Sequence, residues 1–97
     1  MALVQAFEFT FELAWNTMKD YLESEGFDNV KSSKQSIRTA FQAELITDAE
    51  GWMAVLERRN LATHTYNSVI LAESVTFIVN TFSPLVRTLH EALKNRL

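Results

Sequence analysis

The chain has 97 residues, a length typical of one small domain. Its 47% hydrophobic and 22% charged residues exclude an intrinsically disordered chain, and two Gly and one Pro are too few for a turn-rich β fold. A formal charge of −3 excludes a general basic nucleic-acid binder, and the absence of Cys excludes disulfides and thiolate zinc sites.

The first predicted element is a helix from residue 3 to residue 22, which ends at Gly26. Its apolar face, at intervals of three and four, carries Leu3, Phe7, Phe11, Ala14, Trp15, Met18 and Leu22. A narrow polar stripe carries Gln5, Glu8, Glu12, Asn16 and Lys19, and Val4, Phe9 and Leu13 lie on the flanks outside the main apolar face. A helix that is apolar over most of its circumference is expected at the centre of a bundle or in contact with a second chain.

Two capping signatures predict the next two helices. Ser32 with Gln35 opens a short helix whose face carries Ile37, Ala40 and Phe41 and which stops near Glu44. Thr47 with Glu50 opens a third helix through Trp52, Val55, Leu56 and Arg59. Because Arg59 follows Trp52 by seven residues, we expect it on the same apolar face.

The segment from Arg59 to Tyr66 carries the candidate chemistry. Arg59 and His64 have four residues between them, and Tyr66 follows His64 by two. Arginine offers a permanently charged fork of donors for phosphate, and histidine exchanges protons near neutral pH. In an uninterrupted helix the two would point about 140° apart. Either the helix breaks between Arg59 and His64, or the site combines residues of two chains.

A long last helix is predicted after Asn67 and Ser68, which offer an N-cap. Its packing seam carries Leu71, Val75, Ile78, Phe82, Leu85, Leu89 and Ala92. Pro84 lies inside it and frees the carbonyl of Asn80, so we expect a kink there. The whole chain, residues 1–97, is predicted to form a single all-α domain.

Two separated stretches, 7–15 (FEFTFELAW) and 59–66 (RNLATHTY), resemble the nucleotidyltransferase substrate-binding protein family of the HEPN superfamily. Lys31, Ser32, Trp52 and the last helix extend the resemblance to nearly the full length. The resemblance implies an antiparallel up-and-down helical bundle, usually a homodimer, that works beside a separately encoded minimal nucleotidyltransferase. Many HEPN proteins are metal-independent ribonucleases, and those paired with such a transferase include toxins of toxin–antitoxin modules.

The resemblance also implies roles for individual residues. Arg59 and His64 match the arginine and histidine of the HEPN motif, Asn60 the polar residue after the arginine, and Tyr66 a tyrosine that the transferase modifies with AMP. Family members have a further helix before the segment with which this chain begins. We therefore expect a tighter or larger oligomer than usual, or a truncated chain.

Two functional hypotheses follow, with an inactive helical dimer as a third. In the first, the chain is a binding subunit that presents substrate to a partner nucleotidyltransferase. In the second, it is an endoribonuclease in which Arg59 holds the scissile phosphate and His64 transfers the proton. Glu8, Glu12 and Asn16 are interpreted as a solvated stripe, with the wall of a cleft as the alternative. We expect a cytoplasmic protein with no cofactor, metal, membrane or DNA partner; RNA is its partner only in the second hypothesis, and any contact with it is local.

Overall fold

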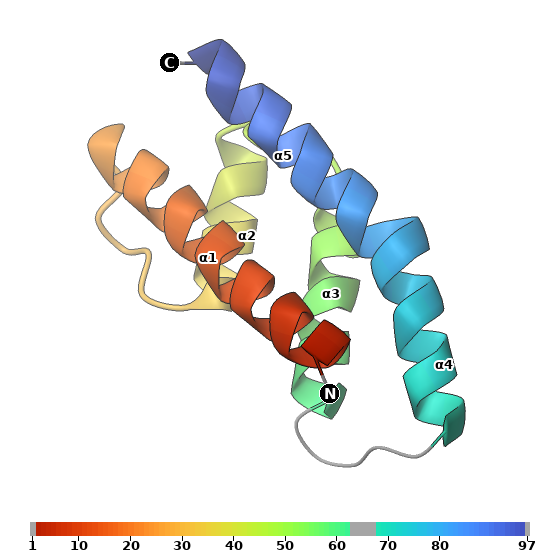
Figure 1. Ribbon diagram of the computed structural model, residues 1–97. Helices are drawn as coiled ribbons and strands as arrows, with labels where there is room; N and C mark the ends of the chain where they lie inside the picture. Colours follow the sequence, from red (N-terminus) through yellow and green to blue (C-terminus); the bar gives the residue numbers. More distant parts are fainter. Residues whose placement is uncertain (1, 63–67, 97) are drawn as a thin grey trace.

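Five α-helices and one π-helical segment make up the described part of the chain (Figure 1). The computed structural model describes residues 2–62 and 68–96, and within them the side chains of residues 5–60 and 72–96. The elements are α1 (Ala2–Ser24), α2 (Ser33–Gln42), α3 (Ala49–Ala62), α4 (Ser68–Phe77), η1 (Ile78–Phe82) and α5 (Ser83–Arg96). No β-strand occurs within those ranges, so the predicted all-α fold is confirmed.

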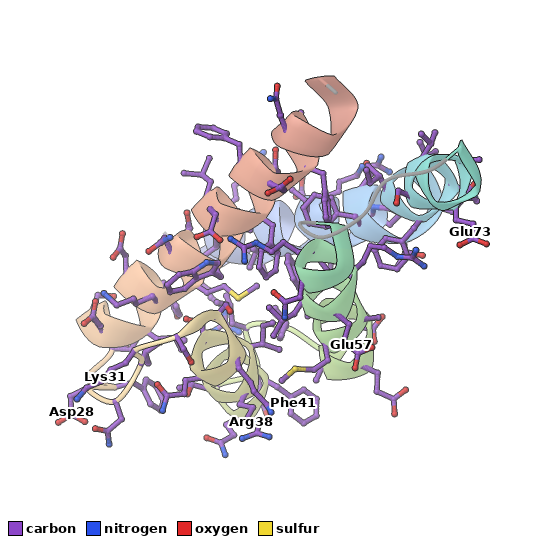
Figure 2. The ribbon with its side chains drawn as sticks, turned by 90° about the horizontal axis from the view of Figure 1, so that it is seen from below. Asp28, Lys31, Arg38, Phe41, Glu57 and Glu73 are labelled. Atoms are coloured by element: carbon purple, nitrogen blue, oxygen red, sulfur yellow. The ribbon has the colours of Figure 1, made fainter. Side chains whose placement is uncertain are left out.

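The long helical stretches alternate in direction. In Figure 1, α1 runs upward, α3 runs downward, and α4 and α5 together run upward again. The short α2 and its flanking loops connect α1 to α3. Figure 2 shows from below that α1 (orange) is inclined to α3 (green) and does not lie parallel to it. The predicted up-and-down helical bundle is confirmed. None of the described helices combines the length and apolarity that a membrane crossing requires.

The predicted apolar face of α1 lines the core. Phe7, Phe11, Ala14, Met18 and Leu22 are all buried, whereas Trp15 is half-buried. The other buried apolar residues among the described side chains come from the later helical elements and from the loops on either side of α2: Val30, Ile37, Ala40, Leu45, Ile46, Trp52, Val55, Ile78, Phe82 and Leu89. The flanks of α1 remain uncovered, since Phe9 is 72% and Leu13 59% exposed. These helices therefore cover only one side of α1.

Three aromatic rings join separate helices at the centre of the core. Phe82 lies edge-on to Phe7, with ring centroids 4.9 Å apart, and edge-on to Trp52, with centroids 6.3 Å apart. Edge-to-face aromatic pairs add stabilisation beyond that of the area they bury. Phe82 thus connects η1 to both α1 and α3.

Glycine ends α1 as predicted. Gly26 has φ +97°, a conformation open to glycine at little cost. Its N–H donates to the Glu23 carbonyl at 3.1 Å, and the Phe27 N–H donates to the Leu22 carbonyl at 3.0 Å. This pair of bonds is the Schellman motif, which satisfies the last carbonyls of the helix.

The start of α2 is confirmed, and one residue of its face is corrected. Ser32 Oγ accepts a hydrogen bond from the Gln35 N–H at 3.2 Å, while Gln35 Oε1 accepts from the Lys31 N–H at 2.9 Å. Ile37 and Ala40 are buried, but Phe41, predicted on the same face, is 50% exposed. Phe41 lies 100° beyond Ala40 around the helix, which turns it past the edge of the buried stripe.

The N-cap of α3 is Asp48, so the prediction of Thr47 was wrong by one residue. Asp48 Oδ1 accepts a hydrogen bond from the Gly51 N–H at 2.8 Å. A Cβ at position 51 would lie 2.5 Å from Asp48 Oδ2, so glycine permits this close approach. A carboxylate also interacts more favourably than a hydroxyl with the positive end of a helix.

The predicted interruption of the last helix is a π-helical turn. The Ser83 N–H donates to the Ile78 carbonyl, five residues back. Pro84 follows as the second residue of α5, where its missing N–H costs least. Figure 1 shows that α4 and α5 point in different directions on either side of this turn. The kink predicted from Pro84 is therefore confirmed.

Replacing Ser36 by alanine is expected to stabilise the protein by about 0.5–1.5 kcal/mol. Ser36 is fully buried in α2, and its Oγ has no hydrogen-bond partner among the described residues. Alanine removes the unsatisfied hydroxyl and favours the helix. Urea denaturation would measure the gain, and an unchanged or lower midpoint would contradict it. Ser33→Ala, at a less buried position of the same helix, is the control.

Candidate functional site

Arg59 lies near the C-terminal end of α3, on the face that packs into the bundle. It follows Trp52 and Val55, which are 1% and 0% exposed, on that side of the helix. The arginine side chain is 33% exposed, so it reaches from the core to the surface. The structure therefore places Arg59 on the Trp52 face, as predicted from its spacing.

The guanidinium of Arg59 meets Glu12 of α1. Arg59 Nη2 donates a hydrogen bond to Glu12 Oε1 at 2.9 Å, across 47 residues of sequence. The pair joins the end of α3 to the middle of α1. Sequence periodicity placed Glu12 on a polar stripe of α1, and in the structure this residue of the stripe lies against the candidate arginine.

Both oxygens of Glu12 are engaged. While Oε1 accepts from Arg59, Oε2 accepts from Trp15 Nε1 at 2.9 Å. Trp15 lies one helical turn after Glu12, so this bond forms within α1 and does not depend on α3. The indole therefore fixes the carboxylate that meets Arg59. Sequence reasoning assigned Trp15 only to the core or an interface, although the Glu-x-x-Trp spacing was a signal for this contact.

The other residues of the predicted stripe contribute differently. Asn16 is exposed, and its Nδ2 donates to the backbone carbonyl of Glu12 at 2.8 Å. Glu8 is half-buried and makes no hydrogen bond or ion pair with the described residues. Of the three, only Glu12 forms a hydrogen bond or ion pair with Arg59 in the described part of the chain.

The Arg59 guanidinium makes one hydrogen bond, to Glu12, with the described residues. Its Nε is covered from solvent and has no hydrogen-bond partner among the described residues. An arginine fork has five N–H donors, of which the bond to Glu12 takes one. Within the described residues, Arg59 is thus a partly exposed cation that uses one of its donors for Glu12, and a guanidinium suits an oxygen-rich anion.

The rest of the predicted motif is only partly within the described chain. Asn60 follows Arg59 in α3 and is exposed. His64 and Tyr66 lie outside the described residues. Whether Arg59 and His64 converge within one chain or across two therefore stays a prediction. Within the described ranges, no three His, Asp or Glu side chains are grouped so as to hold a metal ion.

Arg59 does not line an enclosed cavity among those found in the described residues. A groove of about 500 Å³ lies between α1 and the η1–α5 stretch, where Phe7, Phe82 and Val86 form apolar walls. A smaller space of about 330 Å³ lies between the start of α3 and the π-helical turn. Arg59 and Glu12 line neither of these two spaces.

The chain is similar to known proteins. The family described as "Nucleotidyltransferase substrate binding protein like" matches residues 1–95. A protein of Haemophilus influenzae (strain ATCC 51907 / DSM 11121 / KW20 / Rd) named "Probable ribonuclease HepT" is 32% identical over 68 residues. That similarity covers 66% of this chain and 47% of the relative, so the chain spans about half the relative's length. With a family match over nearly its whole length, the chain belongs to the nucleotidyltransferase substrate-binding protein family.

Proposed function

We propose that the chain is the substrate-binding partner subunit of a two-component system with a minimal nucleotidyltransferase, of the toxin–antitoxin type. The observation that carries this proposal is the family match over residues 1–95. The chain's two glycines, Gly26 and Gly51, stand apart in the sequence, so it has no glycine-rich loop to cradle a nucleotide. A separate transferase would therefore supply the nucleotide chemistry.

In this role the subunit acts as a homodimer or larger homo-oligomer. The uncovered flank of α1, with Phe9 72% and Leu13 59% exposed, supports an additional protein contact there. Arg59 provides a cation at the surface of each subunit for a phosphate-containing substrate.

Co-expression with the small nucleotidyltransferase encoded nearest to this chain is expected to yield a stable complex. With ATP and Mg²⁺, the transferase should add AMP to Tyr66, and Tyr66→Phe should abolish the addition. Size-exclusion chromatography would measure the complex, and intact-protein mass spectrometry the modification. Failure to form a complex, together with an unmodified Tyr66, would count against the partner role.

A second candidate function is metal-independent cleavage of RNA, and the name of the Haemophilus relative, a probable ribonuclease, favours it. Arg59 would hold the scissile phosphate and stabilise its developing charge, and His64 would transfer the proton. Attack by the ribose 2′-oxygen forms the bond to phosphorus and breaks the bond to the 5′-oxygen. The 2′-hydroxyl proton leaves through a base, the 5′-oxygen gains a proton, and the product is a cyclic phosphate.

The two candidates are connected through Tyr66. An AMP on Tyr66 would add bulk and negative charge seven positions from Arg59 in the sequence. That charge would compete with an RNA phosphate for the arginine. The partner transferase would then silence the ribonuclease and act as its antitoxin.

A further inference from the structure

The Arg59–Glu12 pair joins a candidate anion-binding cation to a carboxylate. A carboxylate and a phosphate compete for the same planar fork of guanidinium donors. With Glu12 Oε1 at 2.9 Å from Nη2, the positive charge of Arg59 is balanced before any ligand arrives. A phosphate bound beside the intact pair would also meet the repulsion of a nearby negative charge.

We propose that Glu12 sets the anion affinity of Arg59: its carboxylate occupies the guanidinium in the free protein, and a phosphate group binds by displacing it. This inference rests on the proposed role of Arg59 as a phosphate-binding residue. Glu12 is therefore a specificity-determining residue, because a ligand binds only if its interaction with Arg59 is more favourable than the ion pair that it displaces.

Arg59 and Glu12 can separate without burying an unpaired charge. The side chains of Arg59 and Glu12 are 33% and 43% exposed, so both can gain water as they separate. Glu12 also keeps a partner after leaving Arg59, since Trp15 Nε1 holds its other oxygen at 2.9 Å. The displaced carboxylate is therefore neither buried nor left without a hydrogen bond.

The buried Nε of Arg59 supplies the second observation. It has no hydrogen-bond partner among the described residues, although the guanidinium already bonds to Glu12 through Nη2. Nε and Nη2 form one edge of the fork, and a phosphate would engage both with two oxygens once the groups that cover Nε have moved. Glu12 engages only one of these donors because its second oxygen is directed to Trp15.

The test uses the two tryptophans as reporters. Inorganic phosphate is titrated into ¹⁵N-labelled protein at constant ionic strength, and the indole N–H signals are followed by NMR. The Trp15 signal should shift saturably as Glu12 leaves Arg59, because this indole bonds to the same carboxylate. Trp52, which is 1% exposed in the core, should stay unchanged and so reports that the fold is intact.

Glu12→Gln is expected to tighten phosphate binding about tenfold, because it removes a full negative charge a few ångströms from the ligand. Glu57→Gln makes the same change of net charge at an exposed position of α3 and should bind like the unmodified protein. Figure 2 shows Glu57 on the side of α3 that faces away from α1. Glu12→Ala should tighten phosphate binding as well, which would show that the gain in Glu12→Gln does not come from a contact of the new glutamine amide with phosphate.

Two outcomes separate the inference from the function on which it rests. If Arg59→Ala loses phosphate binding but Glu12→Gln binds no tighter than Glu57→Gln, the inference about Glu12 is wrong and the phosphate site stands. If Arg59→Ala binds phosphate like the unmodified protein, Arg59 is not the phosphate-binding residue and both fail. A purely structural pair would lower the unfolding midpoint in Glu12→Gln without tightening binding, which would also overturn the inference.

Discussion

Replacing Phe82 by alanine is expected to lower the free energy of unfolding by about 3–5 kcal/mol, the usual cost of deleting a buried aromatic side chain. Phe82 is 3% exposed and contacts Phe7 and Trp52 edge-on, so its loss opens a cavity where η1, α1 and α3 meet. Domains of this size are stable by only about 5–15 kcal/mol, so the change removes a large fraction of the total. The melting temperature should fall by roughly 20 °C.

Phe9→Ala is the matched control for Phe82→Ala. It removes the same ring from a position that is 72% exposed, so the unfolding free energy should change by no more than about 0.5 kcal/mol in the isolated chain. Phe82→Leu, which keeps most of the volume, should cost less than Phe82→Ala. Chemical denaturation followed by circular dichroism would measure all three. Equal losses in Phe82→Ala and Phe9→Ala would show that Phe82 is not central to the core.

Local signals in the sequence were sufficient for the end of α1 and the start of α2, whereas the cap predicted at Asn67 lies outside the described residues. Gly26 and the Ser32–Gln35 pair act through backbone groups a few residues away, so their effect can be inferred without the rest of the fold. The prediction of Thr47 was wrong because Asp48 beside it is the stronger capping residue, whose carboxylate favours the positive end of the helix. Gly51 has no Cβ, so the Asp48 carboxylate can approach its backbone closely. The spacing of apolar residues does not reveal this approach.

The position of the kink in the last helix was predictable from the sequence, but its π-helical geometry was not. Pro84 lacks an N–H, so a kink was expected where the helix loses the bond to the Asn80 carbonyl. A π-helical turn from Ile78 to Phe82 accommodates it, and this turn lies where Phe82 contacts two other helices. The π-helical form of the break therefore coincides with contacts between distant helices. The spacing of apolar residues in the sequence does not specify those contacts.

At the candidate site, too, the sequence predicted local features but not the contact between distant helices. The Trp52 spacing predicted that Arg59 lies on the inner face of α3, and the polar stripe of α1 included Glu12. Their contact crosses 47 residues and depends on how α1 is inclined to α3. No local pattern contains that angle, so the stripe was interpreted as a solvated surface. The bond from Trp15 to Glu12 was within reach of sequence reasoning, because the two residues lie one helical turn apart.

Replacing Arg59 by alanine is expected to lower metal-independent RNA cleavage by at least about 100-fold, the effect typical of removing a group that stabilises transition-state charge. Arg59→Lys should retain part of the activity, because it keeps the charge and loses the fork that matches phosphate. The fold should survive both changes, since the Arg59–Glu12 pair is exposed at both ends and such pairs contribute about 0–1 kcal/mol. Cleavage would be measured on single-stranded RNA in excess EDTA.

Arg58→Ala is the control that separates a local charge effect from a catalytic one. Arg58 adjoins Arg59 in sequence but is directed to α4, where its guanidinium lies 4.0 Å from Glu73 and 5.2 Å from the centre of the Phe77 ring. Removing it changes the net charge equally and should leave cleavage within about threefold, because Arg58 makes no contact with Glu12. Equal losses in Arg58→Ala and Arg59→Ala would indicate nonspecific attraction of RNA. Cleavage that survives Arg59→Ala unchanged would exclude Arg59 from catalysis and leave the partner-subunit role to be judged by the transferase complex alone.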